Sequence, residues 1–298
     1  MTNYKKLLPM HDDARVTTQI GYLPLSVMEF SKADNAKWKA KAHYEQDEDS
    51  HRRSRTAGYL PGLKQSEFPP AQAEFILKYW SLKGSKVVDP FAGRATRAVM
   101  TTLLEREYYG YEISPKTVTN SKAHFKKIGI EGKPTLYLSD GCKMAETKDD
   151  FADLVMTCPP YHYLETYESV PGQLSDCDTY EDFLTHIDEC AKNINRVMKA
   201  GTFCIWVIAD WRDDKGYRCF TKDSHNIFKK NGLPQHDEII VKNQSPFAAL
   251  QAAKAASKRI ASKIHEVIQI YKKPGDYVVP NYCSVDKINE NADQFFEL

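Results

Sequence analysis

The chain has 298 residues, of which 42% are hydrophobic, 11% aromatic and 27% charged. This length and composition suit one large folded domain or two small ones and exclude a disordered chain. Lysine and arginine number 41 against 40 aspartates and glutamates, and the formal net charge of +1 excludes a uniformly basic nucleic-acid coat and a strongly acidic surface.

Neither a membrane span nor a secretion signal is expected. The apolar runs fall well short of the roughly 18 residues that a span needs, and the first 15 residues lack a basic, apolar and small-residue signal pattern. The seven cysteines form no C-x-x-C pair, and no histidine stands at ligand spacing beside them. We therefore expect a soluble cytoplasmic protein with neither a disulfide framework nor a metal site.

The first 66 residues show no regular pattern and are treated as an N-terminal extension. An acidic run at 45–49 precedes a basic run at 51–55 and a turn-rich segment at 58–62. Such a charge block beside glycine and proline predicts a solvated loop, and phosphate contact by the arginines is the alternative.

From residue 67 onward, helices and strands alternate. Residues 71–80 have apolar side chains at helical spacing, and two prolines at 69–70 suit the first turn of a helix. The other helices are expected over 96–105, 118–128, 180–198 and 224–230. The strands are expected over 86–89, 108–112, 135–138, 152–157, 202–209, 238–241 and 266–271. This order predicts a doubly wound α/β domain over 67–275, with an antiparallel pair at the sheet edge and a C-terminal tail over 276–298.

Three acidic segments follow the first three strands, where ligands bind in doubly wound sheets. Residues 89–93 make a glycine turn that lets a ligand approach the backbone, and the G-x-x-x-x-G-K-[ST] phosphate loop is absent. Glu112 is placed to accept hydrogen bonds from ribose hydroxyls. Asp140 is placed to accept one from an exocyclic purine amine. Singly, each acidic residue could be a turn or cap residue, but together they outline a nucleoside site. These candidate cofactor residues are Asp89, Pro90, Phe91, Ala92, Gly93, Glu112, Ile113, Asp140 and Gly141.

The fourth junction, Cys158-Pro159-Pro160-Tyr161, is the candidate catalytic segment. Two prolines after a buried strand stiffen the backbone and remove two amide donors, and the neighbouring carbonyls point outward. Carbonyl acceptors followed by an aromatic ring suit a planar base that carries an amino group.

The segments D-P-F-A-G and T-C-P-P-Y together resemble the cofactor and catalytic motifs of adenosylmethionine-dependent DNA amino methyltransferases, which act on N4 of cytosine or N6 of adenine. Phe68 and Pro69 resemble the segment before the cofactor motif in that family. Later stretches, at 161–167, 180–184, 210–216 and 265–266, look most like phage and bacterial methylases. The resemblance covers 67–275. It implies a Rossmann-like methyltransferase sheet, S-adenosylmethionine as cofactor, double-stranded DNA as partner, and restriction-modification in a bacterial or phage-infected cytoplasm.

Two positions depart from the family pattern. Ala95 stands where a second glycine is common, and Cys158 stands where the family has aspartate, asparagine or serine. A thiol is a weak acceptor, so polarisation of the amine would depend more on the Pro159 carbonyl. Cysteine is nearest in shape to serine, which favours N4 of cytosine slightly over N6 of adenine. A nucleophilic Cys158, as in C5-cytosine methylases, is an alternative, although there the cysteine follows a proline.

Substrate contacts are expected from residues after the catalytic segment. Two of them, at 210 and 212, would position the base or a phosphate, or would form a structural ion pair. An Ala-rich arm at 244–262 would lie over DNA, or would be a solvated helix. Residues 140–190 are acidic and 212–273 basic, which predicts a divided surface whose basic part holds phosphates. The candidate substrate residues are Tyr163, Asp210, Arg212, Lys254, Lys258 and Arg259.

No sizeable insertion between the motifs resembles a separate recognition domain. Specificity would then come from residues 1–66, 162–180 and 243–263, from a homodimer or from a separate partner chain. Two other functions stay open. One is methylation of guanine N2 in RNA or of a protein amide, because N-P-P-Y-like elbows also serve those nitrogens. The other is a weakly active nucleic-acid-binding homologue. Cys158 suggests this alternative because its thiol is a weak acceptor at the catalytic position.

Overall fold

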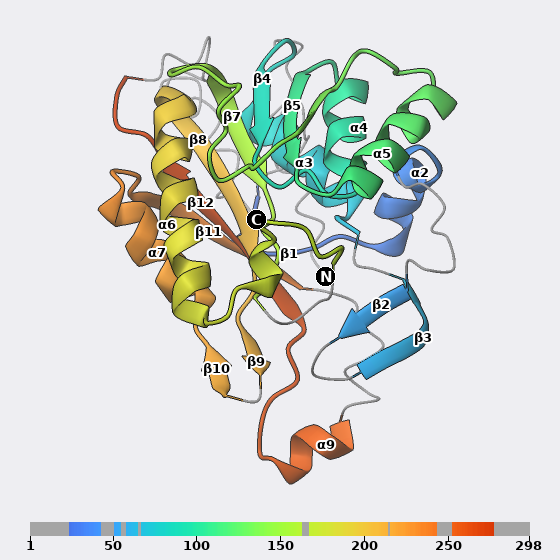
Figure 1. Ribbon diagram of the computed structural model, residues 1–298, viewed down its shortest axis with the longest axis vertical. Coiled ribbons are helices and arrows are strands. Elements are labelled where there is room, and N and C mark those ends of the chain that lie inside the picture. The colour runs from blue at the N-terminus through green and yellow to red at the C-terminus, as the bar shows by residue number, and fades with distance from the viewer. Residues whose placement is uncertain are drawn as a thin grey trace, which may run out of the picture.

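The computed structural model describes residues 24–42, 51–54, 58–64, 67–162, 167–213, 215–242 and 252–276. Within them, one eight-stranded sheet has the strand order β1-β11-β12-β8-β7-β4-β5-β6 (Figure 1). Its strands are β1 (Val27–Glu29), β4 (Lys86–Asp89), β5 (Glu107–Glu112), β6 (Thr135–Leu138), β7 (Ala152–Thr157), β8 (Met198–Ile208), β11 (Gln235–Lys242) and β12 (His265–Lys272). The strands from β6 to β8 are parallel neighbours, and β12 is antiparallel to both β8 and β11.

Helices cover both faces of this sheet (Figure 1). The helices are α2 (Lys32–Ala42), α3 (Pro70–Trp80), α4 (Thr96–Leu103), α5 (Pro115–Lys127), α6 (Tyr180–Val197), α7 (Phe220–Lys230) and α9 (Ala252–Ser257). Helices α3 and α4 pack with the sheet residues Val87, Leu154 and Met156, whereas α6 packs on the opposite face with Val88 and Val155. Alternate residues of the central strands are therefore buried beneath different helices, as a doubly wound sheet requires.

Two short hairpins lie outside the main sheet. They are β2 (His51–Ser54) with β3 (Gly58–Lys64), and β9 (Trp211–Asp213) with β10 (Gly216–Arg218). In Figure 1 both hairpins and α9 project at the same end of the molecule, below the carboxyl ends of the parallel strands. No helix in the described ranges is long and apolar enough to cross a membrane.

The fold class predicted from the sequence is confirmed, and every helix and strand predicted between 67 and 275 is present. Several boundaries differ by three or four residues. Helix α5 begins at Pro115 because the Ser114 hydroxyl caps it by accepting from the Thr117 amide at 3.0 Å. Strand β8 begins at Met198, directly after α6, because its first residue already pairs with Ala152 of β7.

The N-terminal extension is partly regular, in contrast to the loop expected there. Strand β1 pairs with β11, Val27 opposite Ile240, and so extends the sheet beyond the antiparallel strands. Helix α2 lies on α3, where the Trp38 indole donates to Glu74 at 2.6 Å. A three-residue strand is too short to show a period of two, and the helix has few apolar residues, so the sequence pattern shows neither element. The acidic run at 45–49 lies outside the described residues.

Candidate functional site

A cavity of about 540 Å³ opens at the carboxyl ends of the central parallel strands. Its lining comes from the segments that follow β4, β5, β6 and β7, together with residues before α3 and in the loop before α6. All four predicted catalytic residues line it, as do all but one of the predicted cofactor residues. The lining residues predicted from the sequence are Phe68, Pro69, Pro90, Phe91, Ala92, Gly93, Glu112, Ile113, Asp140, Gly141, Cys158, Pro159, Pro160 and Tyr161.

The turn after β4 approaches the neighbouring junctions closely. Gly93 has φ 54°, and its amide donates to the Glu112 carboxylate at 2.9 Å. A Cβ atom at Gly141 would lie 1.7 Å from the carbonyl oxygen of Pro90, so only glycine fits there. Ala95, at the position where a second glycine was expected, has φ 52° and begins α4 from the left-handed region. The first three junctions thus form one continuous wall.

Glu112 stands at the centre of that wall. Its second oxygen accepts the Ser114 amide at 2.8 Å, so each carboxylate oxygen holds one backbone N–H. Burial raises the pKa of Glu112, and the amides of Ser114 and Gly93 oppose that rise. The carboxylate keeps lone pairs for ligand hydroxyls, and Ile113 adds an apolar surface beside it. Asp140 lines the cavity while its carboxylate accepts the Cys142 amide at 2.9 Å and pairs with Lys143 at 3.0 Å.

Asp89 is the predicted cofactor residue that does not line the cavity. It is fully buried, and its oxygens are 2.7 Å from Arg97 Nε, 2.9 Å from the Tyr108 hydroxyl and 2.7 Å from the Thr157 hydroxyl. A carboxylate surrounded in this way lies under the site, out of reach of a ligand in the cavity. Asp89 therefore supports the site rather than contacting a ligand. The sequence pattern predicts that Asp89 stands at the end of a strand. It does not predict that the side chain points away from the cavity.

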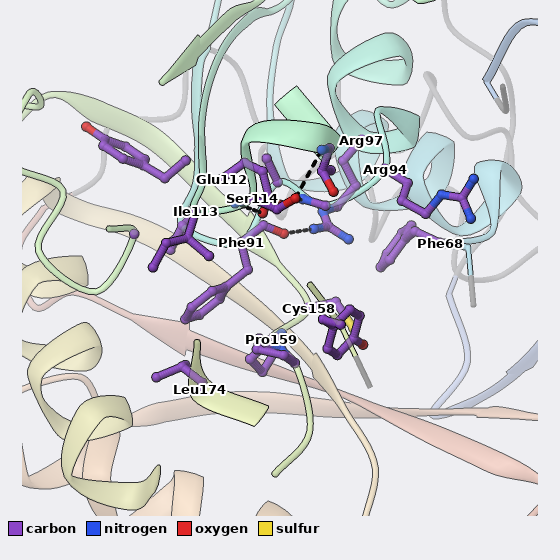
Figure 2. A pocket seen from close by; sticks show the side chains of 18 of the residues that line it. Phe68, Phe91, Arg94, Arg97, Glu112, Ile113, Ser114, Cys158, Pro159 and Leu174 are labelled. Carbon is purple, nitrogen blue, oxygen red and sulfur yellow. Dashed lines mark hydrogen bonds between the residues drawn. The ribbon is translucent and has the colours of Figure 1, made fainter. Parts of the chain in front are cut away.

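The catalytic segment lies across the cavity from Glu112 and Ser114, as Figure 2 shows for Cys158 and Pro159. Cys158 packs against the core beneath α3. Burial lowers the pKa of Arg97, but the Asp89 carboxylate and, to a smaller extent, the Cys158 thiol raise it, and the net pKa is raised. The Tyr161 ring contacts Trp211 edge to face, with centroids 5.3 Å apart.

The loop before α6 contributes residues that the sequence motifs do not indicate. The Ser114 hydroxyl donates to the Glu168 carboxylate, and Glu168 and the buried Leu174 both line the cavity. These contacts join residues 54 positions apart, so no local pattern could have predicted them. Glu266, at the start of β12, also lines the cavity.

The predicted substrate residues Asp210 and Arg212 do not line the cavity. The Asp210 carboxylate accepts the amide and hydroxyl of Thr221, both at 2.9 Å, and the Tyr217 hydroxyl at 2.9 Å, so it holds the β9–β10 hairpin to α7. Arg212 is exposed, with its guanidinium 4.9 Å from the Tyr217 ring centroid.

Of the cations predicted in the arm, two are placed. Lys258 and Arg259 are exposed just after α9. Tyr163 lies outside the described residues, as does the side chain of Lys254.

This geometry suits a reaction between two bound molecules. One end of the cavity has carboxylates at Glu112 and Asp140 for hydroxyl and amine donors. The other end is lined by Pro159 and the aromatic residue Tyr161, which suit a second, planar group. Because one cavity of about 540 Å³ contains both ends, a group can pass directly between the two molecules.

Comparison with known proteins gives one family match. A family model described as DNA methylase, for the N6 and N4 methyltransferases, matches residues 13–123 and 152–296. The match begins within the N-terminal extension and leaves out residues 124–151, which contain β6 and Asp140. No curated relative matches the sequence.

Solved structures with the same architecture include a geranyl diphosphate methyltransferase in complex with GPP and sinefungin, 14% identical, with a TM-score of 0.51 over 68% of this chain and 79% of that chain. The [4+2]-cyclase SpnF is 13% identical, with a TM-score of 0.50 over 79% of this chain and 88% of that chain. TrmN from Thermus thermophilus is 12% identical, with a TM-score of 0.48 over 70% of this chain and 50% of that chain. At these identities the likeness is one of fold.

Proposed function

The chain belongs to the N6/N4 DNA methylase family, and from this premise we propose that it methylates N4 of cytosine in double-stranded DNA, with N6 of adenine as the alternative target. Membership makes it an S-adenosylmethionine-dependent enzyme that methylates amino groups of DNA. The choice of cytosine depends on Cys158, whose shape is nearest to that of a serine. We place the reaction in a bacterial or phage-infected cytoplasm, within a restriction-modification system.

The observation that carries the proposal is that the Cys158–Tyr161 segment and Glu112 line one cavity. Bound S-adenosylmethionine supplies a methyl group on a positively charged sulfur, and transfer to the amine breaks that carbon–sulfur bond, forms a carbon–nitrogen bond and releases one amine proton. Glu112 accepts the ribose hydroxyls of the donor, and Asp140 accepts its adenine amine. The cavity volume is within the usual range for a ligand of this size.

The catalytic segment prepares the amine for attack. The nitrogen lone pair of a base amine is delocalised into the ring, so acceptors that bind the amine hydrogens localise it. The Pro159 carbonyl is the stronger acceptor in the segment, because sulfur in Cys158 accepts weakly. Tyr161, supported by Trp211, stacks on the flipped base and holds it at attack distance.

The DNA would lie against the end of the molecule from which the two hairpins and α9 project (Figure 1). Arg212 on the β9–β10 hairpin and Lys258 and Arg259 after α9 are exposed cations at that end. They are suited to backbone phosphates, which position a duplex without reading its sequence. Sequence specificity then depends on further segments of the chain, on a second copy or on a partner.

The test is transfer of label from tritiated S-adenosylmethionine to unmethylated genomic DNA, followed by nucleoside analysis of the product. We expect labelled N4-methylcytosine. Labelled N6-methyladenine would contradict the choice of base but not the reaction. Label in RNA or protein with none in DNA would overturn the proposal, and RNA and total protein are therefore assayed in parallel.

A further inference from the structure

We propose that the carboxylate of Glu266 accepts a hydrogen bond from the target amine and receives the proton that the amine loses, a role for which the Cys158 thiol is poorly suited. This inference rests on the proposed function, because it assigns a further residue to the same reaction.

The direction of β12 brings Glu266 to the site. The parallel strands end at the cavity, but β12 runs the opposite way, so its first residues reach that edge. Val267 pairs with Ile208 of β8, and Trp206 of β8 pairs with Thr157 of β7. Glu266 therefore lies just beyond the end of β8, two strands from the catalytic segment. It is partly buried and lines the same cavity as Cys158.

Glu266 and Cys158 lie on the same face of the sheet. Alternate residues of a strand share a face, and Ile268 and Ile270 of β12 are in the core cluster beneath α3. Glu266 stands two residues before Ile268 and therefore shares this face. Met156 of β7 belongs to the same cluster, and Cys158, two residues later, packs against it. Both side chains thus point to the α3 side. The registers separate them by two strand spacings of about 4.8 Å and by two residues, roughly 6.6 Å, along the strand direction, which leaves room for a base between them.

The other carboxylates of the described lining come from different segments: before α3, at the end of β5, after β6 and in the loop before α6. Glu67 lies 3.7 Å from Arg94, Glu112 accepts two backbone amides, Asp140 pairs with Lys143, and Glu168 accepts the Ser114 hydroxyl. Within the described part of the cavity, Glu266 is the lining carboxylate that comes from β12. It lies on the far side of β8 from the donor wall, which is the wall formed by the segments at the ends of β4, β5 and β6. Its position suits the second substrate rather than the methyl donor.

A carboxylate supplies what the thiol lacks. The amine nitrogen becomes positively charged as its bond to the methyl carbon forms, and a charged acceptor stabilises that state more than a neutral one does. Glu266 then takes the amine proton and passes it to water, so the methylated amine is left neutral. Sulfur is a weak acceptor, and Cys158 would mainly leave space for the base.

The test compares variants of the full chain for kcat with saturating DNA and donor, and for equilibrium binding of S-adenosylmethionine. Loss of a charge-assisted hydrogen bond in E266A should lower kcat about 10- to 100-fold and leave donor affinity within about twofold of wild type. E266Q keeps an acceptor oxygen and should lose about tenfold or less, and C158A about threefold or less. The matched control is E238A, on the neighbouring strand β11 and outside the cavity, which should stay within about twofold of wild type.

A rescue experiment separates a chemical role from a structural one. Asparagine at position 158 supplies an amide oxygen, so C158N in the E266A background should recover kcat by about fivefold or more. The inference is overturned if E266A keeps its kcat, if E266A and E266Q both lose donor affinity, or if C158N recovers nothing. If the wild-type chain transfers no label to DNA, the proposed function itself fails, which is a distinct result.

Discussion

The Thr157 hydroxyl donates a 2.7 Å hydrogen bond to the Asp89 carboxylate and so joins the ends of β7 and β4. Thr157 immediately precedes the catalytic segment, and Asp89 begins the turn that shapes the donor wall. Arg97 and Tyr108 bind the same carboxylate, so the group is paired although it is fully buried. This buried network fixes the position of the catalytic segment relative to the turn after β4.

Replacing Thr157 with valine should destabilise the fold. The substitution keeps the shape of the side chain but removes one donor from a buried carboxylate, which costs about 1–3 kcal/mol. The free energy of unfolding, measured by urea denaturation, should fall by that amount. T157S retains the hydroxyl and should lose less. Equal losses in the two variants would mean that packing, and not the hydrogen bond, is what matters at this position.

Ala95 offers a route to a more stable protein. It is 2% exposed and has φ 52°, where a side chain costs about 1–2 kcal/mol relative to glycine. A95G removes that cost. Glycine also raises the conformational entropy of the unfolded chain, which offsets part of the gain, so we expect a net increase of about 0.5–1 kcal/mol in the free energy of unfolding. A98G is the control, because Ala98 is equally buried within α4 and glycine there should cost about 1 kcal/mol. A lower stability for A95G would contradict the expectation.

Tyr161 should affect the target base and not the donor. Y161A removes the ring that stacks on the base, a contact worth about 1–3 kcal/mol, so transfer of label should fall about 5- to 150-fold. Donor affinity, measured by calorimetry, should stay unchanged. Y161F keeps the ring and its edge-to-face contact with Trp211 and should retain most of the activity. Full activity in Y161A would refute the assignment of the catalytic segment.

Donor binding should depend on pH through Glu112. Burial raises the pKa of this carboxylate above its ordinary value of 4.5, so it becomes protonated at a higher pH than an exposed glutamate. Protonation removes acceptor capacity for the ribose hydroxyls, and donor affinity should therefore fall as the pH is lowered through the raised pKa. Binding titrations across this range provide the measurement. E112Q should bind weakly at every pH in the series, and a wild-type affinity that does not change with pH would exclude this role.

Lys258 and Arg259 should contribute to DNA affinity by binding backbone phosphates. Charge reversal at both positions should weaken binding at low salt and reduce the slope of log affinity against log salt by about one unit for each phosphate that is no longer neutralised. Fluorescence anisotropy with a labelled duplex measures both effects, and donor binding serves as the check on folding. Reversal of Lys126 and Lys127, exposed at the far end of α5, is the matched control. An identical salt slope in the two double variants would count against the proposed DNA-binding surface.

Much of the fold and the cavity follows from local sequence. The segments Asp89–Gly93 and Cys158–Tyr161 are contiguous, each follows a short apolar strand, and their glycine and prolines shape the backbone locally. Parallel strands end at one edge of a sheet, so recognising the strands was enough to bring these segments together. That these two segments line one cavity could therefore be predicted without knowledge of any long-range pairing.

What the sequence by itself determined is the set of chemical groups at this edge and the α/β architecture that gathers them. Only the tertiary structure decided which way each group faces. Asp89 is turned into a buried network, Ser114 meets Glu168 across 54 positions, and β1 extends the sheet by pairing with β11. Glu266 reaches the cavity because β12 runs antiparallel. The direction and partners of a strand are set by non-local pairing and burial, which a local pattern of residues does not contain.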